Sequence, residues 1–161
     1  MDFYQLGSYK EQILKMIAAD EDIMHFFSPD CCLDLPYIPG MVMEGQNLIC
    51  TDSYIAKAGG RAITEVGVDI YVMFHKDNMS ISDEVRNRYQ EKGYRGNPID
   101  IVVQALGRRL NGCKDFGIGS LRPNMEYPVR SYIPQEDTWE YYGKILSYTG
   151  SDFIKDFRKV I

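Results

Sequence analysis

The chain has 161 residues, of which 45% are hydrophobic and 25% charged, as in an ordinary soluble globular protein. This length fits one domain over residues 1–161, which can bury a core without help from disulfides or metals. The formal net charge of −5 argues against a general nucleic-acid binder, because such proteins present a basic patch to phosphates. No apolar run approaches the roughly 20 residues needed to cross a membrane, so we expect no membrane contact.

The first segment has the pattern of a broken helix. Ser8 and Glu11 form S-x-x-E, which is typical of a capping box at a helix start, and apolar residues follow at helical spacing. We expect Asp20 to cap a second piece and Ser28-Pro29 to end it. Residues 29–46 hold three prolines and two glycines, so they cannot form a regular element. Their apolar content predicts packing on their own domain or on a neighbouring subunit.

A long hairpin is predicted next. Residues 47–56 form the first strand, 57–60 the turn with its Gly-Gly pair, and 61–75 the second strand. The second strand alternates with period 2, which indicates a sheet with one face on the core. The predicted core face holds Val66, Val68, Ile70, Val72 and Phe74. The other face holds Gly67, Asp69, Tyr71, Met73 and His75, a mixture that suits partial cover by another element or chain.

The polar stretch 78–96 indicates an exposed arm or loop, with a short helical turn at 83–90. Asn97-Pro98 then begins a second helix, with Asn as N-cap and Pro at the first helical position, and Asn111-Gly112 ends it. Two strands complete the chain, at 117–134 and 139–153. The predicted fold class is α+β: a small, mostly antiparallel sheet with a long hairpin and helices packed on one face.

No catalytic constellation emerges from the motifs. His75 is interpreted as a strand-terminal histidine on a solvated edge. His25 with Cys31 and Cys32 lacks a fourth zinc ligand. The glycine-rich GCKDFGIG follows a helix, whereas a phosphate loop precedes one. We therefore expect no enzyme activity, no cofactor and no metal. A small enzyme using Cys113, a Cys/His metal site and a host-side binding module stay open as alternatives.

The four cysteines form no C-x-x-C pair, and the polar start MDFYQLGSYKEQ is unlike a signal peptide, so we expect reduced thiols in a cytosolic setting. Nineteen Phe and Tyr rings and one Trp are not easily hidden in a core of this size, and the twelve tyrosines and eight methionines belong to types enriched at protein contacts. Contact with another chain and plain core packing both stay open for these residues. The predicted interface residues are Lys57, Gly59 and Gly60 in the hairpin turn, Arg86, Arg88, Tyr89 and Tyr94 in the arm, and Trp139 and Tyr141 near the last strand.

The ordered segments resemble the tail terminators and other neck or tail-completion proteins of tailed bacteriophages. The resemblance spans about residues 8–155. It is carried by YKEQILKMIAADEDIMHFF, ITEVGVDIYVMFHKD, IDIVVQALGRRLNG, KDFGIGSL and WEYYGKILSYTGSDF.

The resemblance implies a structural virion protein. Such proteins form a ring, usually hexameric, that caps the finished tail tube and joins it to the head-side connector. The implied partners are further copies of the chain, the tail tube protein, the head-closure or connector protein and, as an additional candidate, the tail sheath. DNA would pass through the lumen without specific binding, which suits a negative net charge. The implied location is the virion tail or neck, and the host cytoplasm during assembly. A head-closure or connector role is the alternative within the virion.

Overall fold

Strand β3 (Ala62–His75) occupies the middle of a six-stranded sheet in this computed structural model, which describes residues 4–34, 45–59, 62–114, 120–132 and 140–150. It pairs antiparallel with β2 (Leu48–Gly59) on one side and with β6 (Tyr141–Gly150) on the other. The strand order is β1-β2-β3-β6-β4, and β5 also pairs with β6. The short strands are β1 (Cys32–Leu33), β4 (Arg122–Pro123) and β5 (Val129–Tyr132), of which only β1 is parallel to its neighbour.

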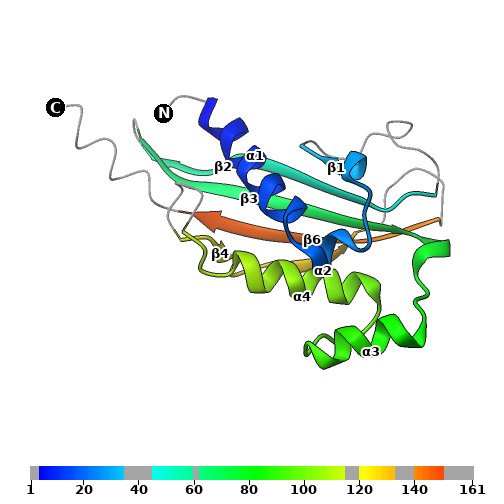
Figure 1. The fold of residues 1–161 in the computed structure, drawn as a ribbon. Coiled ribbons are helices and arrows are strands. Elements are labelled where there is room, and N and C mark those ends of the chain that lie inside the picture. Colours follow the sequence, from blue (N-terminus) through cyan, green and yellow to red (C-terminus); the bar gives the residue numbers. More distant parts are fainter. Residues whose placement is uncertain (1–3, 35–44, 60–61, 115–119, 133–139, 151–161) are drawn as a thin grey trace.

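The helices lie on one face of this sheet (Figure 1). They are α1 (Tyr4–Ala18), α2 (Glu21–Met24), α3 (Asp83–Glu91) and α4 (Pro98–Leu110), with short 3₁₀ turns η1 (Pro29–Cys31) and η2 (Lys76–Asn78). The five predicted core residues of β3, from Val66 to Phe74, are fully buried. They share one core with side chains of all four helices, among them Ile13, Ile23, Tyr89 and Leu106. The predicted α+β class, with a mostly antiparallel sheet, is therefore confirmed.

The second face of the sheet is partly covered by its own side chains. Leu48, Cys50, Met73 and Tyr141 form a smaller buried cluster there with Cys31. The four cysteines of the chain, all of them in the described residues, form no disulfide.

Helix starts follow the capping chemistry at two of the three predicted sites. Asp20 caps α2 by accepting hydrogen bonds from the backbone N–H groups of Asp22 and Ile23. Asn97 and Asp100 form a reciprocal capping box at α4. The capping box predicted at Ser8 is wrong, because α1 already begins at Tyr4. Ser8 therefore lies inside the helix, and its hydroxyl accepts a hydrogen bond from Gln12 instead.

Several predicted boundaries change. The strand expected at 117–134 is two short pieces, β4 and β5, separated by a turn, as Pro123 and Pro128 on an edge would require. β2 continues past Ala56 to Gly59. Residues 35–44, Gly60, Trp139 and the chain after Gly150 lie outside the described residues.

Replacing Asp20 should destabilise the fold, because this buried carboxylate serves two elements. One oxygen caps α2, and the other lies 2.6 Å from Nε of Arg109 on α4. A lost cap and a lost charge-assisted hydrogen bond together cost roughly 2–4 kcal/mol. We expect Asp20→Ala to lower the free energy of unfolding by this amount in urea denaturation. Asp20→Asn keeps a capping oxygen and should cost less, and equal losses for both variants would contradict this account.

Candidate interaction surface

The β2–β3 hairpin extends beyond the rest of the sheet. Its strands stay paired as far as Gly59 and Ala62, whereas pairing between β3 and β6 begins only at Val66. We call this part of the hairpin, residues 56–59 of β2 and 62–65 of β3, the ribbon. It has two strands in the described chain, and Figure 1 shows it reaching past β6. Its pairing shifts register on both sides of Lys57. An isolated two-stranded ribbon is marginally stable in water, so this ribbon is suited to contact a further chain.

The outer edge of β2 is open along most of its length. β1 pairs only with Ile49 and Cys50. From Thr51 onward, no strand within the described residues pairs with this edge. The backbone N–H of Ser53 on this edge donates to the side chain of Asp52 at 2.9 Å. A strand edge without a neighbouring strand is a template for a strand of another chain.

The ring of Tyr54, on this edge strand, lies over Gly67 of the neighbouring strand β3. A Cβ atom on Gly67 would come within 2.2 Å of Cζ of the Tyr54 ring, so the ring occupies the space that the glycine leaves. Partial burial, followed by the Asp69 carboxylate, raises the pKa of the Tyr54 hydroxyl. Asp69 lies in turn 3.8 Å from the guanidinium of Arg130 on β5. The tyrosine is thus held in place while 36% of it stays exposed.

The opposite edge of the sheet carries an exposed apolar turn between β4 and β5. Met125 is 98% exposed, Tyr127 57% and Val129 44%. The turn is nevertheless fixed, because the side-chain oxygen of Asn124 accepts hydrogen bonds from the backbone N–H groups of Glu126 (2.9 Å) and Tyr127 (3.0 Å).

Two backbone hydrogen bonds to Ser147 of β6 anchor the same turn. The N–H of Asn124 donates to the Ser147 carbonyl at 2.8 Å, and the Ser147 N–H donates to the carbonyl of Pro128 at 3.0 Å. Met125 and Tyr127 are therefore presented on an ordered backbone, which lowers the entropy cost of binding a partner. The sequence analysis missed this surface. Asn124, a residue that favours turns, and the two flanking prolines were the signals that could have revealed it.

The predicted interface residues divide into three groups. Lys57, Arg86 and Arg88 are exposed. Gly59 forms the last described pair of the hairpin, with Ala62, and Gly60 and Trp139 lie outside the described residues. The other three predicted residues are buried inside this chain: Tyr89, Tyr94 and Tyr141.

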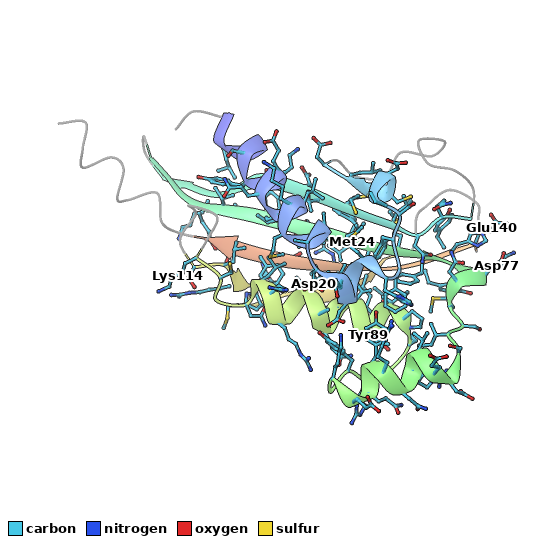
Figure 2. All side chains as sticks on the ribbon, viewed as in Figure 1. Asp20, Met24, Asp77, Tyr89, Lys114 and Glu140 are labelled. Atoms are coloured by element: carbon cyan, nitrogen blue, oxygen red, sulfur yellow. The ribbon has the colours of Figure 1, made fainter. Side chains whose placement is uncertain are left out.

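Tyr89 and Tyr94 show that residues 78–96 are not a simple exposed arm. The Tyr89 hydroxyl donates to the Asp22 carbonyl at 2.9 Å, and the Tyr94 hydroxyl donates to the Asp22 carboxylate at 3.2 Å. Lys92 forms an ion pair with the same carboxylate. Figure 2 shows Tyr89 pointing from α3 toward α2. This segment is therefore docked on the helical layer, and only its outer face, which includes Arg86, is free to meet a partner.

His75 is buried, so the prediction of a solvated histidine is wrong. Its ring packs edge-on against Tyr141, and its Nδ1 accepts a hydrogen bond from the backbone N–H of Asp77. Carboxylates flank both ring nitrogens, Asp77 at 3.5 Å and Glu140 at 3.9 Å, at one end of the sheet (Figure 2). The accepting role of Nδ1 places the proton of the neutral ring on Nε2, facing Glu140. This arrangement stabilises the end of β3 and caps η2.

The thiol of Cys113 lies far from this histidine. Cys113 follows α4 and is hydrogen-bonded through its backbone to Leu121, beside the strand that pairs with Thr149. His75 pairs with Tyr141, eight residues away along β6. At about 3.3 Å per residue, the two ends of this strand are roughly 26 Å apart. Cys113 and His75 therefore cannot form a catalytic pair.

A polar cleft of about 380 Å³ lies beside the end of α2 and is lined by His25, Asn47 and Asn78, among others. Its amides are bonded to each other and to backbone: Asn78 donates to Asn47 and to the Gly45 carbonyl, and Asn47 donates to the Phe26 carbonyl. These hydrogen bonds connect the start of β2 to the residues after α2 and to η2. Among the described residues, no three His, Cys, Asp or Glu side chains gather to hold a metal ion. None of the helices in that part of the chain combines the length and apolar character needed to span a bilayer.

Comparison of the chain with protein-family models, with curated proteins and with solved structures gave no significant match.

A pair of substitutions on α3 tests the division between buried and exposed residues. Tyr89 is 1% exposed and bonded to Asp22, so Tyr89→Ala should lower the free energy of unfolding by about 3–5 kcal/mol. Arg86 lies exposed on the same helix, and Arg86→Ala should change it by no more than about 0.5 kcal/mol. Chemical denaturation measures both. A small effect of Tyr89→Ala would mean that the helix is not docked.

His25 makes stability depend on pH. Partial burial, followed by the nearby Arg88 guanidinium, lowers the pKa of His25 below its ordinary value of 6.5. The unfolded chain therefore binds the proton more readily than the folded one. This contribution to stability is complete above pH 6.5 and is lost as the pH falls from 6.5 toward the folded pKa. We expect His25→Gln to reduce the loss of thermal stability between pH 7.5 and 5.5, measured by circular dichroism; an unchanged or larger loss would contradict the assignment.

Proposed function

We propose that this chain is a structural virion protein without catalytic activity, a tail terminator that forms a ring on the phage tail tube and joins the tube to the head-side connector. The observation that carries this proposal is the placement of the exposed apolar side chains. Of the five exposed large hydrophobic residues in the described chain, Met125, Tyr127 and Val129 lie at one edge of the sheet and Tyr54 lies in the strand at the opposite edge, while the fifth, Tyr142, lies on β6. A ring needs two different surfaces on each copy, because each contact joins one surface to the other surface of the next copy.

The arrangement of the segments that resemble tail terminators supports this function. Within the described residues, the first segment forms α1 and α2, the second β3, the third α4 and the last β6. These elements make up the helical layer and the centre of the sheet. Outside these segments the described chain leaves α3, β2 and the short strands β1, β4 and β5. The sheet edges formed by β2 and β5 have no further strand among the described residues, and a protein working by self-assembly would expose such edges.

Charge is compatible with a channel for DNA. A net charge of −5 gives the chain little attraction for phosphates, so DNA can pass through a ring of six such copies without being held. The proposed partners are the tail tube protein at one end of the ring and a head-closure or connector protein at the other, with the tail sheath as an additional candidate. The protein would reside in the virion neck and, before assembly, in the host cytoplasm.

The test is to stop production of the protein with an early amber codon in the phage or prophage that carries the gene, and to examine the particles by electron microscopy. A tail terminator predicts tubes of irregular, excessive length that remain unattached to heads, because nothing stops their growth. Supplying the wild-type gene in trans should restore attached tails of uniform length.

Two other results would overturn the assignment in different ways. Tails of normal length beside heads that have lost their DNA would point to head closure. Intact virions would exclude a role in the neck. The purified wild-type protein offers a parallel readout, since native mass spectrometry and negative-stain images should show closed rings, either free or on isolated tail tubes.

A further inference from the structure

We propose that neighbouring copies in the ring join their sheets, with the outer edge of β5 in one copy paired antiparallel to the outer edge of β2 in the next. This inference rests on the proposed ring. It goes beyond that proposal by naming the two strands, their direction and their register.

Strand direction is compatible with such a junction. β2 and β6 both run antiparallel to β3, so they run the same way, and β5 runs antiparallel to β6. β5 is therefore antiparallel to β2 within one copy. Rotation about a ring axis roughly parallel to the strands preserves their direction, so β5 of one copy meets β2 of the next as an antiparallel pair.

The free length of β2 selects the register. β1 occupies the edge at Ile49 and Cys50, and the pairing of β2 with β3 becomes irregular after Ile55. The window that pairs regularly with β3 and has no described strand on its other side is thus Thr51–Ile55, and β5 has four residues to place in it. The Asp52 side chain, which accepts from the Ser53 N–H, would have to release it to the incoming strand. Residues paired across antiparallel strands share a face, and Val129 lies on the helix-covered face with Ile55 and Ser53.

Only one of these two partners fits. Setting Val129 against Ser53 would place Tyr132 opposite Cys50, where β1 is already paired. Setting Val129 against Ile55 keeps all four pairs inside the window, from Ile55 down to Asp52. This register joins two apolar β-branched residues on the helix side. It also places Arg130, whose guanidinium lies 3.8 Å from Asp69 of its own chain, opposite Tyr54 on the other side.

The same register accounts for the two features that the isolated chain leaves exposed. Asn124 and Pro128 both bond to Ser147, one residue beyond the partner of Val129 on β6. The turn with Tyr127 and Met125 therefore leaves the sheet at the level where β2 of the next copy passes from Ile55 into its ribbon. The turn would then pack beside the two strands of the ribbon. Its exposed side chains would be removed from water by this contact. One junction thus uses the ribbon, the open edge of β2 and the apolar turn together.

Photocrosslinking tests the junction directly. We would place p-benzoylphenylalanine at Met125, whose side chain is 98% exposed, and irradiate assembled rings made from a mixture of ¹⁴N- and ¹⁵N-labelled copies. The expected products are mixed-isotope crosslinks to residues 55–59. The control places the same group at Glu84, an exposed residue of α3, and should give no crosslink to these residues.

A substitution pair provides a second readout. Val129→Glu puts a charge opposite Ile55 and should raise the concentration needed for ring assembly at least tenfold, without changing the circular dichroism or the thermal unfolding of the monomer. Asn87→Glu adds the same charge on an exposed position of α3 and should leave assembly unchanged.

Each outcome bears on one proposal or the other. Rings with the expected crosslinks and a Val129→Glu defect support the junction. Rings that crosslink elsewhere and tolerate Val129→Glu overturn the junction but leave the terminator proposal standing. Crosslinks to residues 55–59 in open filaments or pairs, without rings, support the junction and overturn the terminator ring. Failure to associate in solution and on isolated tail tubes overturns both.

Discussion

The structure depends on β3 being paired on both sides while it buries one complete face. Its five core residues alternate from Val66 to Phe74 and all lie against the helical layer. Burial of each such side chain contributes roughly 1.5–3 kcal/mol. Because a shift of one residue would turn all five toward the other face, this strand fixes the register of β2 and β6 as well. The positions of the ribbon, of the β4–β5 turn and of the two sheet edges follow from that register.

Helices cover one face of the sheet, whereas its two edges have no further strand among the described residues. The contacts of the helical layer are made within the chain. Asp20 and Asp22 bind α2 to α4 and α3, and Tyr89 of α3 and the following Tyr94 enter the core. The margins show the opposite behaviour, since β2 has a long stretch without a described partner and the β4–β5 turn places apolar side chains in water. The buried contacts and the exposed apolar side chains thus lie in different parts of a small domain.

Local patterns predicted the elements whose causes are local. The period-2 alternation of β3, the cap at Asp20 and the capping box at Asn97 each depend on residues a few positions apart, and each is present. The pattern at Ser8 misled because the same S-x-x-E spacing also fits inside a helix that begins one turn earlier. The α+β class with helices on one face also followed from element order alone.

The errors concern contacts made across long stretches of chain. Residues 78–96 look solvent-exposed because most of them are polar, yet Tyr89 and Tyr94 bind Asp22, about seventy residues earlier in the sequence. His75 is buried because Tyr141 pairs with it from β6. The apolar turn at Met125 was hidden inside a segment interpreted as one strand, and only the pairing of β4 and β5 with β6 separates the turn from the strands.

The close fit of Tyr54 to Gly67 has an evolutionary consequence. Any side chain at position 67 would displace the ring, and a small residue at position 54 would leave the glycine bare, so these two positions should covary among descendants of this sequence.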